Sequence, residues 1–456
     1  MQERLHAMAT VETPLAARAG GPAARPVKAQ HDEPVDAPIE KALDGQAGRL
    51  DGKTGVIVFL AFAAAYFCSA LVRSITATLS PVLTQDFSLQ ARDLGLLGGG
   101  YFLGFAAMQL PLGMWLDRHG PKRVILYFLS LAVLGCLAFS VASSFAWLLA
   151  SRVLIGMGVG ACLMAPLTGY RRWFNAPTLL RANSWMLMTG SLGMLASTLP
   201  VQWLMPLTGW RPLFWILAAL MVLSMAAIAL VVPPWRLRPA QHGAGVAPPD
   251  ENSYALVWRN RFFQKLSPMA FFNYGGLVAV QTLWAGPWMV KVAGYTALES
   301  ATGLFYINAA MLVTFWGWGL LNPWFARHGW SASRLIGWGV PLSLVVLAVN
   351  IALGASTGWP GWALYCVSSS VMGLAQPAVG MAFKASLAGR ALSGYNLMIF
   401  SGVFVVQWGI GLLVDAFAAM GLAPVACFQA AMGVFLCCCI AAYGYFLSVK
   451  VDNPAL

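Results

Sequence analysis

Charged residues are scarce in this chain of 456 residues. Asp, Glu, Lys and Arg make up 10% of it, whereas ordinary soluble domains have about 25%. Hydrophobic residues make up 59% of the chain, and its mean hydropathy is +0.70. A soluble fold has too little interior to bury so much apolar surface, so we expect lipid to be the solvent for most of the chain.

The sequence also lacks the signatures of several function classes. Its eight cysteines lie in apolar segments without metal-ligand spacing, so we expect neither a disulfide framework nor a metal site. No nucleophile–base set or catalytic carboxylate pair is recognisable, which argues against an enzyme, and no cofactor is expected. There is no GxxxxGK[ST] loop, so ATP is not the expected energy source.

Basic residues exceed acidic ones, and the formal net charge is +12. They fall between apolar runs, which indicates a membrane-topology signal rather than a nucleic-acid partner. Fifteen lie in loops on the side of residues 113–124, whereas the alternate loops hold only Arg92, Arg211 and Lys291. Because Lys and Arg favour cytoplasmic loops, we predict an inner-membrane protein with both termini in the cytoplasm.

Apolar windows long enough to cross roughly 30 Å of hydrocarbon recur twelve times. They predict an all-α membrane protein with twelve transmembrane helices in two pseudo-symmetric six-helix bundles. The expected spans are residues 55–83, 93–115, 122–142, 145–169, 180–204, 211–232, 264–289, 300–324, 334–354, 360–383, 393–416 and 423–447.

The longest polar break between spans, residues 233–263, divides them six and six. We therefore predict an N-terminal bundle over 55–232 and a C-terminal bundle over 264–447, joined by a cytoplasmic central loop. Residues 1–54 are rich in Ala, Pro and mixed charge and are expected to form a disordered cytoplasmic tail. Residues 448–456 are expected to form a second cytoplasmic tail.

Short motifs recur at corresponding places in the two halves. RHG at 118–120 returns as RHG at 327–329, and RANS at 181–184 returns as RALS at 390–393. Many secondary transporters are built from such internal repeats, with the substrate site at the repeat interface near the middle of the bilayer.

The densest charge cluster, GMWLDRHGPKR at 113–123, lies between the second and third spans. It reads G-x-x-x-D-R-x-G-x-[KR]-[KR], and this pattern resembles the signature of the major facilitator superfamily. RVLIGMGVGA at 152–161 and GWRPLF at 209–214 support the resemblance, which covers about residues 55–450. It implies a transporter in which two bundles rock about a central site.

The resemblance also implies a conformational latch at this loop. Asp117 is expected beside the N-terminus of a helix of the other half, where a negative charge is favoured. Gly113 is expected to let a neighbouring helix approach closely. The second-half copy, NPWFARHG, has Ala326 in place of the acid, which implies a weaker latch there. The other predicted latch and gating residues are Arg118, Gly120, Lys122, Arg123 and, in the fourth span, Arg152.

Two arginines stand out well inside the spans, Arg73 and Arg152, because insertion of an arginine at a helix centre costs about 2.5–3.5 kcal/mol. Past the first residue of a span, where Asp93 stands, the only acid is Asp415, near the outer end of the eleventh, and no histidine lies in any span. Arg73 thus has no evident partner in the middle of its own half, which predicts an anionic substrate. The alternative is that Arg73 extends to the outer lipid headgroups.

The stretch ALVRSITATLSPVLTQDFSLQARDLG at 70–95 resembles the first helix of the organophosphate and organic-anion branches of the superfamily. Arg73 falls at the position of their anion-binding arginine. The phosphate exchangers pair it with a second arginine in the seventh span, where this chain has none and Gln281 is the nearest polar substitute. The resemblance therefore favours a monovalent or small organic anion over a doubly charged phosphate ester.

Several other polar side chains are candidates for the wall of the solute cavity. Each could equally well join two helices within lipid. The candidates are Gln281, Gln407, Trp284, Tyr66 and Asn273.

These features predict a monomeric secondary active transporter of a small molecule, with an organic anion as the favoured substrate. A co-transported ion, exchange and facilitated uptake all stay open. One alternative is a proton-coupled drug efflux antiporter, although the fifth span, MLMTGSLGMLASTLP, lacks the Gly-Pro element of those exporters. Another is a transporter-like membrane receptor.

Overall fold

The computed structural model describes residues 50–235 and 254–449, and the described chain is helical with short connections. Residues 1–49 and 450–456 of the predicted tails and residues 236–253 of the predicted central loop therefore lie outside the described residues, whereas residues 52–54, predicted as tail, belong to the first helix. The helices of the first half are α2 (Gly52–Phe87), α3 (Ala91–Ser140), α4 (Phe145–Val159), α5 (Ala161–Trp173), α6 (Ala176–Ala196), α7 (Leu199–Thr208) and α8 (Trp210–Val231).

The helices of the second half follow the same plan, with more interruptions. They are α9 (Tyr254–Arg259), α10 (Arg261–Pro268), η2 (Met269–Tyr274), α11 (Gly275–Ala279), η3 (Val280–Trp284), α12 (Ala285–Lys291), α13 (Ala297–Arg327), α14 (Ala332–Leu353), η4 (Gly354–Ser356), α15 (Trp359–Ser369), η5 (Ser370–Leu374), α16 (Ala375–Met381), α17 (Ala385–Ala419) and α18 (Pro424–Ser448).

Eight helical stretches in the described part of the chain are long and apolar enough to cross a membrane, and α4 and α5 together form one of them, Phe145–Trp173. One of them, α3, has two arms, because Gly120 breaks it with φ +76° and ψ 165°. Three further crossings consist of shorter helices joined end to end: α6 with α7, α10 through α12, and α15 through α16. Together these account for the twelve predicted spans.

The break at Gly120 needs glycine for two reasons. Its positive φ is a conformation that side chains other than glycine disfavour. A Cβ at this position would also overlap the indole of Trp235, which packs against the turn. The sharp turn brings the second arm of α3 back beside α4 and α8, which it contacts along its length.

Part of the predicted central loop is helical. Asn260 caps α10, because its Oδ1 accepts hydrogen bonds from the backbone N–H groups of Phe262 (2.9 Å) and Phe263 (3.1 Å). Val257 of α9 and Phe263 are both fully buried. The apolar residues at the end of the predicted loop thus pack against the second bundle and form helices instead of remaining in solvent.

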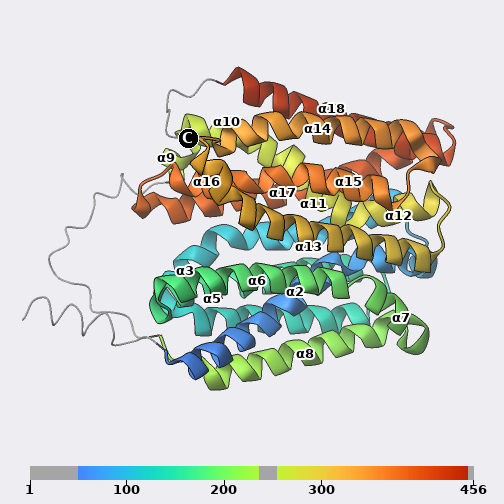
Figure 1. The fold of residues 1–456 in the computed structure, drawn as a ribbon. Coiled ribbons are helices and arrows are strands. Elements are labelled where there is room, and N and C mark those ends of the chain that lie inside the picture. The colour runs from blue at the N-terminus through green and yellow to red at the C-terminus, as the bar shows by residue number, and fades with distance from the viewer. Residues whose placement is uncertain (1–49, 236–253, 450–456) are drawn as a thin grey trace, which may run out of the picture. The chain divides into compact units, whose positions relative to one another are not determined.

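The described helices belong to one compact unit. Helices α2 to α8 pack mostly against one another, and so do α10 to α18, in blue to green and yellow to red respectively (Figure 1). The halves are joined by contacts of α3 with α17 and η3, of α2 with η3, α12 and α13, and of α6 and α7 with α13. The predicted solute site falls among these contacts.

Candidate solute site and gates

Arg73 lies slightly beyond the middle of α2. The helix has 36 residues, and at 1.5 Å per residue Arg73 is about 5 Å past its midpoint, toward the end at Phe87. A helix of this length exceeds the roughly 30 Å hydrocarbon thickness, so Arg73 lies well inside the bilayer-spanning region. Its side chain is partly buried.

The Arg73 guanidinium has few partners. Nη2 lies 3.6 Å from the Met194 Sδ, a weak acceptor, and Nε is buried without a hydrogen-bond partner. One turn further along α2, the backbone of Ala77 lies against Gly286 of α12, in the second half. Arg73 therefore belongs to the interface between the halves.

Carboxylates of the described residues lie far along the helices from this point. The six acidic side chains in the described ranges all lie at or near helix ends. Two ion pairs are resolved there, and both involve Arg92, with Asp93 (3.8 Å) and with Asp415 (3.9 Å). Asp415 thus pairs with Arg92 and not with Arg73, whose positive charge has no carboxylate partner within residues 50–235 and 254–449.

Arg152 on α4 is more completely buried, with 1% of its surface exposed. Its Nη1 donates to the backbone oxygen of Val72 (3.0 Å), the residue next to Arg73. Its guanidinium lies over the Tyr101 ring, 5.2 Å from the centroid, while Nε and Nη2 have no hydrogen-bond partner. Arg152 thus ties α4 to α2 at the level of Arg73, and its predicted gating role remains a prediction.

Three of the predicted cavity residues lie on wide helical turns. Asn273 belongs to η2, and Gln281 and Trp284 belong to η3; both segments are π-helical, a conformation often found at functional sites. The Asn273 Oδ1 is buried without a partner. Gln281 Nε2 donates to the Asn308 Oδ1 (3.0 Å), so it joins two helices of the second half.

Gln407 is fully buried at the contact between the halves. Its Nε2 donates to the Thr282 hydroxyl (3.0 Å), and its backbone oxygen accepts a hydrogen bond from the Trp284 Nε1 (3.0 Å). In this conformation the side chains of Gln407 and Trp284 serve helix packing. Tyr66 differs, because its ring packs against Gly190 of α6 and joins two helices of the first half.

Helices α3 and α17 are in close contact at one end, which we call the Asp415 end. A Cβ at Gly95 would overlap the backbone oxygen of Gln407, and a Cβ at Gly411 would overlap that of Ala91. Asp415 accepts hydrogen bonds from the first backbone N–H groups of α3. The contact continues to Phe105 and Phe400, whose ring centroids are 4.4 Å apart.

This closed end was not predicted from the sequence. The signals were present: the glycine-rich run GLLGGG at 95–100, and Gln407, Gly411 and Asp415 at intervals of four residues on one face of a helix. Small residues at such spacing favour close approach of two helices in a membrane. Neither signal says which helix the glycines face, so the pairing of α3 with α17 had to come from the structure.

The other end of the first arm of α3, the Asp117 end, shows no such contact among the described residues. Asp117 and Arg118 are exposed, and Asp117 forms no hydrogen bond or ion pair with the described residues. A Cβ at Gly113 would meet nothing within 4 Å. The predicted latch contact of Asp117 with the other half is therefore not formed in this conformation.

Lys122 and Arg123 complete the predicted latch cluster. The Lys122 Nζ donates to the backbone oxygen of Val232 (2.7 Å), just past the C-terminus of α8. A cation is favourable at a helix C-terminus, where backbone oxygens lack partners. Lys122 thus fixes the loop to α8, and Arg123 is exposed.

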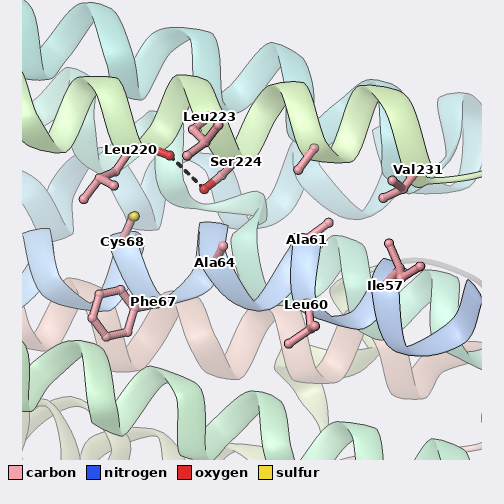
Figure 2. A pocket seen from close by; sticks show the side chains of 11 residues that line it. Ile57, Leu60, Ala61, Ala64, Phe67, Cys68, Leu220, Leu223, Ser224 and Val231 are labelled. Atoms are coloured by element: carbon pink, nitrogen blue, oxygen red, sulfur yellow. Dashed lines mark hydrogen bonds between the residues drawn. The ribbon is translucent and has the colours of Figure 1, made fainter. Parts of the chain in front are cut away.

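A groove of about 420 Å³ lies between α2 and α8 (Figure 2). Apolar side chains such as Ile57, Leu60 and Leu223 line it. Its one lining hydroxyl, that of Ser224, already donates to the backbone oxygen of Leu220 (2.9 Å). With no charged group in its wall, this groove suits lipid acyl chains and not a polar solute.

Twelve crossings in two halves that meet closely at the Asp415 end define a multi-pass membrane transporter. Residues 62–407 match the family model described as Major Facilitator Superfamily, and the chain belongs to this superfamily. The predicted family and the all-α fold are confirmed, as is the prediction that the chain is a transporter and not an enzyme.

Relatives with different printed functions resemble the chain. The multidrug resistance protein MdtL of Shigella flexneri serotype 5b is 27% identical over 238 residues, which are 52% of this chain and 58% of the relative. The 4-hydroxybenzoate transporter PcaK of Pseudomonas aeruginosa is 30% identical over 175 residues, 36% of each chain. The chain thus matches little more than half the length of this MdtL and about a third of PcaK, whereas the MdtL of Escherichia coli O6:K15:H31, 25% identical over 376 residues, is matched over 90% of its length.

A solved structure supports the fold over nearly the whole chain. A bacterial homolog of the human lysosomal transporter Spinster, in an inward-facing and occupied conformation, superposes with a TM-score of 0.71 at 17% identity. The match covers 87% of this chain and 97% of that one.

Proposed function

We propose that this transporter moves a small organic anion across the inner membrane by alternating access, and that Arg73 contacts the anion. The supporting observation is the Arg73 guanidinium, which lies near the middle of a bilayer-spanning helix without a carboxylate partner in the described ranges. An isolated charge at that depth is costly, and a substrate anion would offset the cost. The 4-hydroxybenzoate transporter among the relatives carries a cargo of this kind.

The remaining parts of the proposal concern orientation and assembly. The excess of basic residues in the loops at the Asp117 end supports placing that end, and both termini, in the cytoplasm. With that orientation the closed Asp415 end faces the outside, and the Asp117 end, where Asp117 is exposed, faces the cytoplasm. The chain is proposed to act as a monomer, with its cavity residues drawn from both halves: Arg73, Tyr66, Asn273, Gln281, Trp284 and Gln407.

Uptake into proteoliposomes tests the proposal. Purified protein is assayed with radiolabelled benzoate, 4-hydroxybenzoate and short aliphatic monocarboxylates. Arg73→Ala should lower uptake about 10- to 100-fold, the range expected for the loss of a charged hydrogen bond, and Arg73→Lys should retain part of it. Arg259→Ala, which removes an exposed arginine outside the bundles, is the matched control. Equal uptake by wild type and Arg73→Ala would refute the anion site.

Drug efflux is the second candidate, because MdtL is named as a multidrug resistance protein. A lipophilic cation such as ethidium, assayed in the same proteoliposomes, distinguishes the two. In an efflux antiporter, protons moving down an imposed gradient should drive ethidium in the opposite direction. Arg73→Ala should not abolish that movement. An anion carrier should leave ethidium unmoved.

A further inference from the structure

Asp415 makes an unusual connection between the two halves. It lies near the end of α17, and its two carboxylate oxygens accept hydrogen bonds from the first turn of α3. The Ala91 N–H donates to Oδ1 (3.1 Å), and the Arg92 N–H donates to Oδ2 (3.0 Å). The Arg92 Nε lies 3.9 Å from Oδ2 as well.

The N-terminus of α3 provides strong reasons for a carboxylate at this place. The first N–H groups of a helix have no partner within the helix, and they lie at the positive end of its dipole. The acid of α3 itself, Asp93, accepts from the Gln90 N–H (3.0 Å), which precedes the helix. The N–H groups of Ala91 and Arg92 are therefore satisfied by the second half, through Asp415.

The backbone packing around Asp415 depends on this geometry. Gly411 lies one turn before Asp415, and a Cβ there would overlap the Ala91 backbone oxygen. The glycine lets α17 approach α3 closely enough for a short carboxylate to reach two backbone N–H groups. By contrast, Gly409 on the same helix has nothing within 4 Å of the position of a Cβ.

We infer that Asp415 is the latch that holds the Asp415 end closed, so that the site at Arg73 opens only toward the Asp117 end. This inference rests on the proposed function in one respect, the need for the two halves to separate alternately at each end. Opening the Asp415 end requires the Asp415 carboxylate to leave both N–H groups and Arg92. The strength of these bonds therefore sets the balance between the two open states.

Spin-label distances test this without any solute. Labels are attached through cysteines introduced at Gln85, near the end of α2, and at Met420, just after α17; both side chains are exposed. Cys437 and Cys438, the native cysteines of the described residues that are not buried, are replaced by alanine. Double electron–electron resonance on the full chain in nanodiscs then reports how far the halves separate at the Asp415 end.

Asp415→Asn should raise the long-distance population about fivefold or more, because the charge at the helix terminus is lost. The matched control is Asp93→Asn, which removes the same charge from the same helix end without touching the other half. A second pair tests the packing: Gly411→Leu should open this end, and Gly409→Leu should not.

The proposal is wrong if Asp415→Asn leaves the distances unchanged, or if Asp93→Asn changes them equally. Should Asp415→Asn fail to fold, the two glycine variants decide the outcome. Distances that shift as expected in a protein that takes up no anion would refute the cargo and retain the latch. Anion uptake with unchanged distances would refute the latch and retain the cargo.

Discussion

The two ends of the first arm of α3 differ in how they meet the second half. At the Asp415 end, Gly95 and Gly411 allow backbone contact with α17, and Asp415 satisfies the start of the helix. At the Asp117 end, the acid is exposed and Gly113 faces open space. One rigid helix is thus closed against the other half at one end and separated from it at the other.

This difference indicates how the same residue types can serve opposite states. Each end carries a glycine with an acid close by, Gly113 with Asp117 and Gly411 with Asp415. The acids belong to different halves, so each can contact a helix of the opposite half when its own end closes. In this structure Gly411 and Asp415 contact the opposite half, whereas Gly113 and Asp117 do not. Alternating access requires such a difference between the two ends.

The largest effect is expected from a bulky side chain at Gly95, which would prevent α3 and α17 from packing together at the Asp415 end. In Gly95→Leu the new side chain would overlap the Gln407 backbone oxygen, and overpacking of this kind costs about 1–3 kcal/mol. We expect uptake of the transported solute to fall about tenfold or more. Gly113→Leu, at the open end of the same helix, should leave this conformation intact by the spin-label distances. Equal effects of both variants on those distances would remove the contrast between the ends.

A smaller effect is expected from the idle acid. Asp117→Asn should not destabilise this conformation, because Asp117 has no partner within the described residues. If Asp117 is a latch in the other state, its loss should increase the population of the present conformation about fivefold. Labels at exposed positions on the two sides of the Asp117 end measure this population. A shift toward the closed form of that end would contradict the predicted role.

The smallest effect concerns a single hydrogen bond near the closed end. Trp284→Phe removes the bond from Nε1 to the Gln407 backbone oxygen (3.0 Å) and should lower the free energy of unfolding by about 1 kcal/mol. Trp288→Phe is the control, because that indole is equally buried and its Nε1 has no partner. Thermal unfolding in detergent compares the two. A larger loss for Trp288→Phe would show that packing, and not this bond, stabilises the closed end.

Most of the fold could be predicted from the sequence, because apolar length and loop charge are local signals. The expected spans agree closely with the helices, as at 211–232 against Trp210–Val231. The differences arise where short-range capping or packing decides. Asp51 caps α2 through the Thr54 N–H (3.2 Å) and starts the helix before residue 55. Asn260 and Phe263 similarly make helix out of predicted loop.

The candidate site was harder to predict, since it depends on which helices of the two halves face each other. The positions of the charged residues relative to the predicted spans singled out Arg73 as a charge without a partner. The structure gives it no carboxylate within the described ranges. The same reasoning could not separate cavity residues from packing residues: Gln281 and Gln407 both form buried hydrogen bonds between helices. Their proposed contact with solute still awaits a test.

The seventh crossing has a further consequence. Its two π-helical segments, η2 and η3, flank α11, and each wide turn holds one residue more than an α-helical turn. The seventh crossing therefore contains an additional residue on each side of its middle. Rewinding one wide turn would rotate everything beyond it by about 100°, and would change which of its side chains face Arg73. A shift of register could thus reshape the cavity wall while the rest of the second half stays rigid.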